Sequence, residues 1–298
     1  MARERSRARN VVEAAAAGGL EGFFQALPFP VAEALGRGLA RAVFPLTSRR
    51  ALVTRNLARA FPEKSPGEIA GLRAQVFAHV GGLAAELLHF QGESLESFQQ
   101  RHTVVGNGIE RLRAAAASGR GALITTPHFG NWEMGALAFG PLGFPVTVVV
   151  RPLDNPILDA KLTAFRERFG NRVLPKASAA REILRVLKAG GFVGILPDQH
   201  AHPPDAVVAP FFGRPASTTS AIARLADKTE ALIVPAWDIR VAPGRYELHI
   251  EEPIDVRTLP REERSAEALM TRVNAVLESV IRRSPEQWLW LHNRWRLD

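Results

Sequence analysis

The sequence predicts an α/β protein: a mostly parallel central sheet flanked by helices, preceded by an N-terminal helical region. Six short segments are apolar, mostly β-branched and show little polar alternation, which is typical of strands buried on both faces. Segments with helical periodicity lie between them, and this alternation is the chain order of a parallel α/β sheet. The first third of the chain has no such strand, so we expect it to be helical.

The predicted strands are 121–126, 145–150, 172–175, 191–197, 231–237 and 245–250. The predicted helices between and after them are 131–140, 155–169, 177–189, 217–228 and 265–283. No flexible linker interrupts this series. We therefore expect residues 61–298 to form a single α/β domain and residues 1–60 to form the N-terminal helical region.

Two helices are predicted before the first strand. Residues 49–60, "RRALVTRNLARA", have the pattern of a basic amphipathic helix. After a turn, Ser65 lies three residues before Glu68, with Pro66 at the first helical position, which is a helix start signal. This second helix should continue through "RAQVFAHVGGLAAELLHF".

The charge of the chain is concentrated near its start. The net charge is +8, and residues 1–60 hold ten Arg and four Glu, 10 − 4 = +6. Such a region favours an anionic partner: phospholipid headgroups, nucleic acid or an acidic protein. A solvated, Arg-rich surface is the alternative. Cysteine is absent, which excludes a disulfide scaffold, a thiol nucleophile and a cysteine metal site.

The same region is also apolar, but not enough to span a bilayer. Its longest uncharged stretch, residues 22–32, has 11 residues, whereas a spanning helix needs about 20. Glu13 and Glu21 interrupt the apolar core that a secretory signal requires. We expect an interfacial, membrane-associating element. A helical layer on the core is an alternative that does not exclude it.

The stretch "TTPHFGNWEMG" holds the candidate catalytic residues. Asn131 is a good N-cap, which places Glu133 in the first turn of a helix and His128 in the loop before it. This loop follows a strand, where ligands gather in open α/β sheets. We expect Glu133 to turn back and fix the tautomer of His128. Without a G-x-S-x-G serine, the simplest chemistry is activation of a substrate hydroxyl for attack on an electrophile such as a thioester. A purely structural pair is the alternative.

The sequence around this pair resembles that of a known protein family. "HFGNWEM" has the H-x-x-x-x-D/E form of the glycerophosphate and lysophospholipid acyltransferases. Further fragments resemble one branch, the bacterial lipid A biosynthesis acyltransferases of the late, lauroyl/myristoyl type. They recur in order from about residue 49 to 296: "RRALVTRNLARAFPEKSPGEI", "VVVRPLDNPILD", "GILPDQ", "APFFGRPASTTSAIARLA", "IVPAW" and "PEQWLWLHNRWR".

The resemblance implies a reaction and its participants. His128 would be the general base and Glu133 its orienting acid. The donor would be an acyl thioester of acyl carrier protein or coenzyme A, with no acyl-enzyme and no cofactor. The acceptor would be a glycolipid hydroxyl, most simply that of a lipid A precursor, with a phosphatidylinositol mannoside or another glycolipid as the alternative. The expected place is the cytoplasmic face of the inner membrane, peripheral or monotopic, on an anionic surface and without nucleic acid.

The resemblance also implies substrate-binding residues. Arg151 and Asn155 form an R-x-x-x-N pattern after a strand, and Arg151 is suited to hold a phosphate bidentately. An ion pair of Arg151 with Asp154 or Asp159 is the structural alternative. Asp198 and Gln199 end another strand, where Asp198 could position the acceptor or bind Arg151. In the expected helix 217–228, Thr218 near the N-terminus and Arg214 before it offer anion contacts.

Two features suggest other readings. His200 and His202 follow Asp198, and with His128 they could make a metal-dependent hydrolase. Exposed loop histidines without a metal are the simpler interpretation, and we expect no metal. A non-catalytic membrane-surface protein is the third class. The tail "WLWLHNRWR" suits a lipid boundary or a cap over the core, and we expect it near the mouth of the active site.

Overall fold

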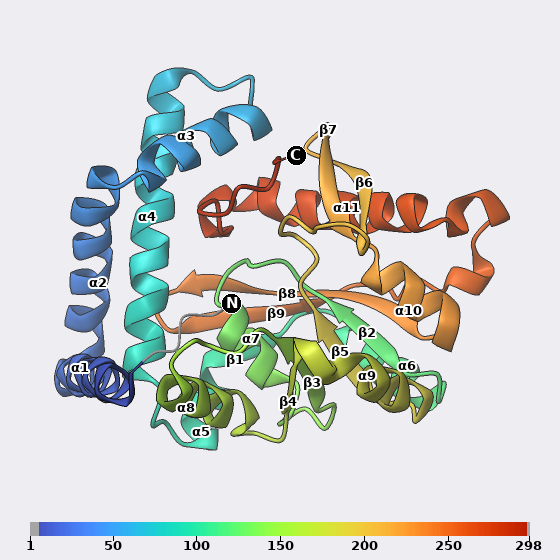
Figure 1. Ribbon diagram of the computed structural model, residues 1–298, viewed down its shortest axis with the longest axis horizontal. Helices are drawn as coiled ribbons and strands as arrows, with labels where there is room; N and C mark the ends of the chain where they lie inside the picture. The colour runs from blue at the N-terminus through green and yellow to red at the C-terminus, as the bar shows by residue number, and fades with distance from the viewer. Residues whose placement is uncertain (1–5, 297–298) are drawn as a thin grey trace.

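The structure is a computed structural model that describes residues 6–296. A seven-stranded sheet lies at its centre, in the order β1-β9-β8-β2-β5-β3-β4 (Figure 1). A separate two-stranded hairpin is formed by β6 and β7. The strands are β1 (His102–Val104), β2 (Ala122–Thr125), β3 (Val146–Val150), β4 (Arg172–Pro175), β5 (Phe192–Ile195), β6 (Ala206–Phe211), β7 (Arg214–Thr219), β8 (Leu232–Ala242) and β9 (Arg245–Ile250).

Eleven α-helices are found in residues 6–296. They are α1 (Arg7–Ala26), α2 (Phe29–Val43), α3 (Arg49–Ala60), α4 (Pro66–His89), α5 (Leu95–Arg101), α6 (Gly108–Ala117), α7 (Trp132–Ala138), α8 (Pro156–Glu167), α9 (Ala179–Lys188), α10 (Ala221–Thr229) and α11 (Ala266–Arg283). Short 3₁₀ turns include η1 (Phe44–Leu46) and η5 (Pro285–Gln287).

The central strands run in one direction. Ala122 of β2 lies in register with Phe192 of β5 and with Leu232 of β8, and both pairings are parallel. Within the sheet, only β8 and β9 are antiparallel. The carboxyl ends of β2, β5 and β3 therefore meet at one edge, which is where parallel sheets place their ligands.

The sheet is buried on both faces, as the lack of polar alternation predicts. Leu123 of β2 belongs to a core cluster that includes residues of α9, α10 and α11. Its neighbours Ala122 and Ile124 belong to a second cluster, formed with α6, α7 and α8. Successive side chains of a strand point to opposite faces. An apolar residue is therefore needed at every position, which explains the continuous apolar runs.

The predicted start of the long helix is confirmed. Ser65 caps α4 by accepting a hydrogen bond from the Glu68 N–H, and the Glu68 side chain accepts one from the Ser65 N–H. Pro66 occupies the first helical position. The predicted helix 49–60 is α3, and its apolar side, with Val53 and Leu57, is buried in the main core.

One predicted helix begins later than expected. The sequence analysis placed a helix at 217–228, but residues Arg214–Thr219 form β7 and the helix begins at Ala221. The turn of the hairpin holds Gly213 at φ +66°, a left-handed conformation that glycine adopts readily. The strand-favouring threonines after it then pair with β6. The sequence analysis also missed β1 and β6.

Helices α1 and α2 lie outside the sheet, against α4 (Figure 1). No helix within residues 6–296 is both long and apolar enough to cross a membrane. Of the thirteen exposed large apolar side chains in the part of the chain that the structure describes, eight belong to α1, α2 and η1. They are Val11, Val12, Leu20, Phe23, Val31, Leu39, Val43 and Leu46.

Helices α2 and α4 approach closely because both have glycine at the crossing. A Cβ added to Gly81 would lie 2.1 Å from the Gly36 carbonyl oxygen, and one added to Gly36 would lie 2.5 Å from the Gly81 carbonyl oxygen. A real Cβ does not approach another backbone so closely. The two glycines thus fix how near α2 lies to α4.

We expect Gly81→Ala to lower the free energy of unfolding by about 1–3 kcal/mol, because the two helices must separate. Gly71→Ala on the same helix is the matched control, since a Cβ there meets nothing within 4 Å. It should raise stability by about 0.5–1 kcal/mol through helix propensity. Urea unfolding followed by circular dichroism measures both, and equal effects of the two changes would contradict this account.

Candidate active site

His128 lies in the loop between β2 and α7. Gly130 of this loop has φ +58°, and a Cβ there would lie 1.7 Å from the carbonyl oxygen of Asp238. Only glycine fits this position. Asn131 caps α7 as predicted, because its side-chain oxygen accepts a hydrogen bond from the Met134 N–H at 3.3 Å. The loop therefore turns sharply from the strand into the helix and leaves His128 at the edge of the sheet.

The carboxylate partner of His128 is Asp198, which follows β5. The His128 ring contacts Asp198 Oδ1 through Nδ1 at 2.8 Å, and the His128 backbone N–H donates to Asp198 Oδ2 at 2.7 Å. Strands β2 and β5 are adjacent and parallel, so the residues that follow them meet at the same edge. A carboxylate at Nδ1 fixes the proton on that nitrogen and leaves the lone pair of Nε2 as the basic position.

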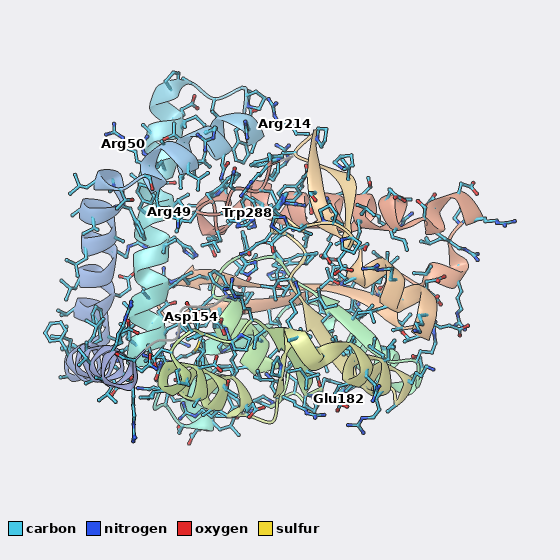
Figure 2. The ribbon with its side chains drawn as sticks, viewed as in Figure 1. Arg49, Arg50, Asp154, Glu182, Arg214 and Trp288 are labelled. Atoms are coloured by element: carbon cyan, nitrogen blue, oxygen red, sulfur yellow. The ribbon has the colours of Figure 1, made fainter. Side chains whose placement is uncertain are left out.

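The C-terminal segment holds this pair in place. The Trp288 Nε1–H donates to Asp198 Oδ2 at 2.7 Å, and the Leu289 N–H donates to the His128 carbonyl at 3.0 Å. Phe129 and Trp288 form an isolated antiparallel bridge. Figure 2 shows Trp288 in the interior of the molecule. Asp198 is only 1% exposed, so its charge is compensated by these donors and not by water.

The electrostatics of the pair follow from this geometry. Burial by itself lowers the pKa of His128, but the negative charge and hydrogen bond of Asp198 outweigh burial, so the pKa is raised above 6.5. Burial likewise raises the pKa of Asp198, but His128 and the Trp288 indole outweigh it and the pKa is lowered. Asp198 therefore stays ionised and stabilises a positive charge on His128.

The second ring nitrogen of His128 has polar and aromatic neighbours. The Gln199 side-chain amide lies 3.3 Å from Nε2. The indole of Trp132 meets the imidazole edge to face, with 5.3 Å between ring centroids. Trp132 and Thr126 also line a narrow cavity of about 40 Å³ whose other lining residues are almost all apolar. The His128 ring thus lies beside a polar amide and beside Trp132, which lines an apolar slot.

Glu133 does not orient His128, contrary to the sequence-based expectation. Its two carboxylate oxygens accept hydrogen bonds from Nε and Nη2 of Arg166 on α8, at 2.8 and 2.6 Å. Because Glu133 points from the first turn of α7 toward α8, it reaches His128 only through its charge, which contributes to the raised pKa. The Glu133 side chain could turn toward His128 or toward α8, and its ion pair with Arg166 holds it toward α8.

Comparison with known proteins identifies the family to which the chain belongs. The family described as "Bacterial lipid A biosynthesis acyltransferase" matches residues 9–297. The chain belongs to the bacterial lipid A biosynthesis acyltransferase family. It is therefore an acyltransferase, and the predicted resemblance is confirmed.

Several curated relatives are similar over most of the chain. The lipid A biosynthesis lauroyltransferase of Escherichia coli K12 is 32% identical over 274 residues, 91% of this chain and 87% of that protein. The palmitoleoyltransferase of the same organism is 29% identical, covering 91% and 86%, and the myristoyltransferase is 25% identical, covering 88% and 79%. The crystal structure of a 1-acyl-sn-glycerophosphate acyltransferase from Thermotoga maritima has 17% identity and a TM-score of 0.40, covering 88% of this chain and all of that one.

In this acyltransferase, the R-x-x-x-N residues take different positions. Arg151 is exposed at the end of β3 and forms no ion pair within residues 6–296, so the suggested pairing with Asp154 or Asp159 does not form. Asn155 is buried and structural: its oxygen caps α8, and its amide donates to the Asn10 carbonyl at 3.0 Å and to Glu13 Oε2 at 3.1 Å. Asn155 joins α8 to α1, and both its side-chain oxygen and its amide are engaged within the protein.

The predicted residues of the 214–219 segment also lie elsewhere. Arg214 is at the outer end of the hairpin, where its Nε donates to the Arg59 carbonyl at 3.1 Å (Figure 2). Thr218 is fully buried, and its hydroxyl accepts a hydrogen bond from Arg294 at 2.6 Å. Neither contacts His128 or Asp198, because the segment is a strand and not the helix N-terminus on which both predictions depended.

The histidines after Asp198 are engaged with protein groups. The rings of His200 and His202 lie 4.7 Å apart, and the His200 N–H donates to His292 Nε2 at 2.8 Å. Within residues 6–296, no group of three or more His, Asp and Glu is arranged to hold a metal ion. Asp198 directs its two oxygens at His128 and Trp288. His128, Asp198, His200 and His202 therefore do not form the metal site that the hydrolase alternative requires.

Sequence reasoning missed three residues that shape the site. Trp288 binds Asp198, Arg166 binds Glu133, and Arg294 donates to the Gln199 carbonyl at 3.4 Å. Burial lowers the pKa of Arg294 to about 10, so it remains charged. The expectation that the tail packs near the active site is confirmed, and its alternating tryptophans were the available signal. Nothing in the sequence around Arg166 marks it.

Asp198→Asn should lower kcat by roughly 10²- to 10⁴-fold, because the imidazolium loses its stabilising charge. The base acts in its neutral form, so the wild-type activity should rise with pH through the raised pKa of His128, above 6.5. Without Asp198, burial dominates and the acidic limb should move to lower pH. The pH profile of kcat/KM measures both effects.

Glu133→Gln is the matched control for this change. It removes a carboxylate that acts on His128 only by its charge, so the acidic limb should move down less than in Asp198→Asn. A larger shift in Glu133→Gln than in Asp198→Asn would contradict the assignment of Asp198 as the partner.

Proposed function

We propose that this acyltransferase moves a fatty acyl chain from the thioester of acyl carrier protein or coenzyme A to a hydroxyl of a lipid A precursor. The observation that carries the proposal is His128, with Nδ1 held by a buried carboxylate, Nε2 beside the Gln199 amide, and its ring against Trp132, which lines an apolar slot. The membership in the lipid A acyltransferase family and the names of the relatives support the acceptor class.

The proposed reaction needs no covalent intermediate on the protein. Nε2 of His128 removes the proton of the acceptor hydroxyl while the hydroxyl oxygen attacks the thioester carbonyl carbon. The tetrahedral intermediate collapses, the carbon–sulfur bond breaks, and the sulfur leaves with the proton that His128 held. Asp198 stabilises the imidazolium between these steps, as carboxylates do for histidine bases in acyl transfer. The products are an ester and a free thiol.

Other residues have supporting roles in this proposal. Gln199 lies at hydrogen-bond distance from Nε2 and is placed to orient the incoming hydroxyl. Arg151, exposed and without an ion pair in the described chain, extends from the same edge of the sheet and offers a guanidinium to a phosphate. Glu133 adds negative charge near the base while it anchors α7 to α8 through Arg166.

The slot beside Trp132 supports a site for the acyl chain. It is lined by residues of β2, β3, β5, β8, β9 and α7, including Ile124 and Val148, and by Phe139, which follows α7. Its volume, about 40 Å³, is smaller than a fatty chain, so a bound chain extends beyond it or displaces side chains. Burying apolar carbon here contributes roughly 0.8 kcal/mol per methylene.

The surface of the N-terminal helices supports a membrane location, on the cytoplasmic face of the inner membrane, peripheral or monotopic. The exposed apolar side chains are concentrated on α1, α2 and η1, and the arginines of the same region attract anionic headgroups and an acidic carrier protein. A helix that lies in the interface presents this combination of apolar and basic side chains.

The test is mass spectrometry of lipids made by the purified protein. It is offered a tetraacylated phosphorylated glucosamine disaccharide or a phosphatidylinositol mannoside, each with acyl carrier protein or coenzyme A donors. We expect a new ester on the disaccharide, and His128→Ala should lower its rate by at least about 10³-fold because the base is lost.

His202→Ala is the control, since its ring contacts His200 and not the base. It should retain activity close to that of the wild type. If the new ester is found only on the phosphatidylinositol mannoside, that lipid and not the lipid A precursor is the acceptor. Full activity of His128→Ala would refute the mechanism.

A further inference from the structure

A second, polar cavity lies on the flank of the molecule where α2, α4 and the C-terminal segment meet. It has a volume of about 530 Å³ and shares no lining residue with the slot beside Trp132. This size is within the range of small-molecule sites. Figure 1 shows α2 and α4 side by side next to the ends of β8 and β9. The lining residues are Arg37, Arg41, Gln75, His79, Arg240, Glu286 and Gln287.

The arginines of this cavity differ in what they already bind. Arg240 is compensated by Glu33 at 2.8 Å and by the buried Glu86 at 2.6 Å. Arg37 shares Glu33 at 3.4 Å. Arg41 is exposed and forms no hydrogen bond or ion pair within the described part of the chain. It follows Arg37 by one helical turn, so the two guanidinium groups lie on the same side of α2.

The cavity lining includes one buried histidine, His79. Burial, with smaller contributions from the charges of Arg240 and Arg37, lowers the pKa of His79 to about 3. His79 is therefore neutral. The positive charges of Arg240 and Arg37 act on its ring although Glu33 and Glu86 bind these arginines. Glu286 is a carboxylate at the rim and opposes an anion. The lining nevertheless holds more cations than anions, since Arg37 and Arg41 stand beside the single carboxylate Glu286, and Gln75 adds an exposed amide.

Two lining residues of the cavity, His79 and Gln287, contact the loop that carries His128. His79 Nε2 contacts the Gly130 carbonyl at 3.2 Å, and the Gly130 N–H donates to the Gln287 carbonyl at 3.1 Å. Gly130 is two residues from His128. A ligand in the cavity would therefore contact residues that hydrogen-bond to this loop, while the loop itself does not line the cavity.

We infer that this cavity binds a phosphate group of a substrate, with Arg41 and Arg37 as its main contacts. Charge-assisted hydrogen bonds from arginine are well suited to phosphate oxygens. The inference rests on the proposed function, in which both the glycolipid acceptor and the pantetheine donor carry a phosphate ester. The acceptor is the better fit, because α2 also has exposed apolar side chains on another side, Leu39 and Val43, and lies at the lipid surface in the proposed function.

Steady-state kinetics of Arg41→Gln with two acceptors test this site. One acceptor is the phosphorylated glucosamine disaccharide lipid, and the other is the same lipid after removal of its phosphates. The variant should raise KM for the phosphorylated acceptor by about tenfold or more, with kcat within twofold, and leave the dephosphorylated acceptor unchanged. If KM rises for the acyl donor instead, the phosphate site stands and the donor occupies it. Unchanged KM for both substrates would overturn the inference.

Arg181→Gln is the matched control, because Arg181 is an exposed arginine of α9 outside both cavities. It removes the same charge and should change neither KM. Arg41 is exposed and without partners in the described chain, so its replacement should not affect folding. Thermal unfolding of Arg41→Gln checks this point.

A binding measurement separates this inference from the proposed function. Calorimetric titration of the full-length protein with glucosamine 1-phosphate needs no acyl transfer. Wild type and Arg181→Gln should bind it equally, and Arg41→Gln should bind it at least about tenfold more weakly. If no acyl transfer is found but this difference is, the proposed function fails and the site stands. Equal binding by all three proteins overturns the site.

Discussion

The hydrogen bond between the His128 ring and Asp198 is the interaction around which the edge of the sheet is built. Asp198 is almost completely buried, and a buried carboxylate without partners would be costly. Three donors compensate it: the His128 ring, the His128 backbone and the Trp288 indole. Two of these come from the loop after β2 and one from the chain end. The charge of one residue thus requires three distant segments to meet.

This requirement explains why the C-terminal tail is rich in aromatic residues. Trp288, Trp290 and Trp295 are buried together and contact Phe211 or Phe212 of the hairpin. They give the tail a fixed position, from which Trp288 and Leu289 reach the catalytic loop. The tail is therefore part of the active-site scaffold, and its packing holds the imidazole in one orientation.

A second electrostatic network supports the same loop from the other side. Asn131 donates to Glu86 at 3.1 Å, Glu86 accepts from Arg240, and Arg240 also binds Glu33 of α2. The N-terminal helices are thereby joined to the loop that carries the base. In the proposed function, α1 and α2 lie on the membrane, and this network connects the lipid surface to the site of reaction through buried ion pairs that water does not weaken.

The amino-acid sequence by itself predicted the alternation of strands and helices, apart from β1 and the β6–β7 hairpin, and the helix starts at Ser65 and Asn131. It also placed His128 in the loop after β2. These are local properties: apolar runs, capping residues and a motif in which spacing is fixed by a short loop. Only the tertiary structure decided which carboxylate serves His128. Glu133 and Asp198 are 5 and 70 residues away from it, and chain distance favoured the wrong one. Adjacent parallel strands bring Asp198 to the ring, and Arg166, from another helix, draws Glu133 away. Pairing across strands and between helices depends on how distant segments pack, and no local pattern records it.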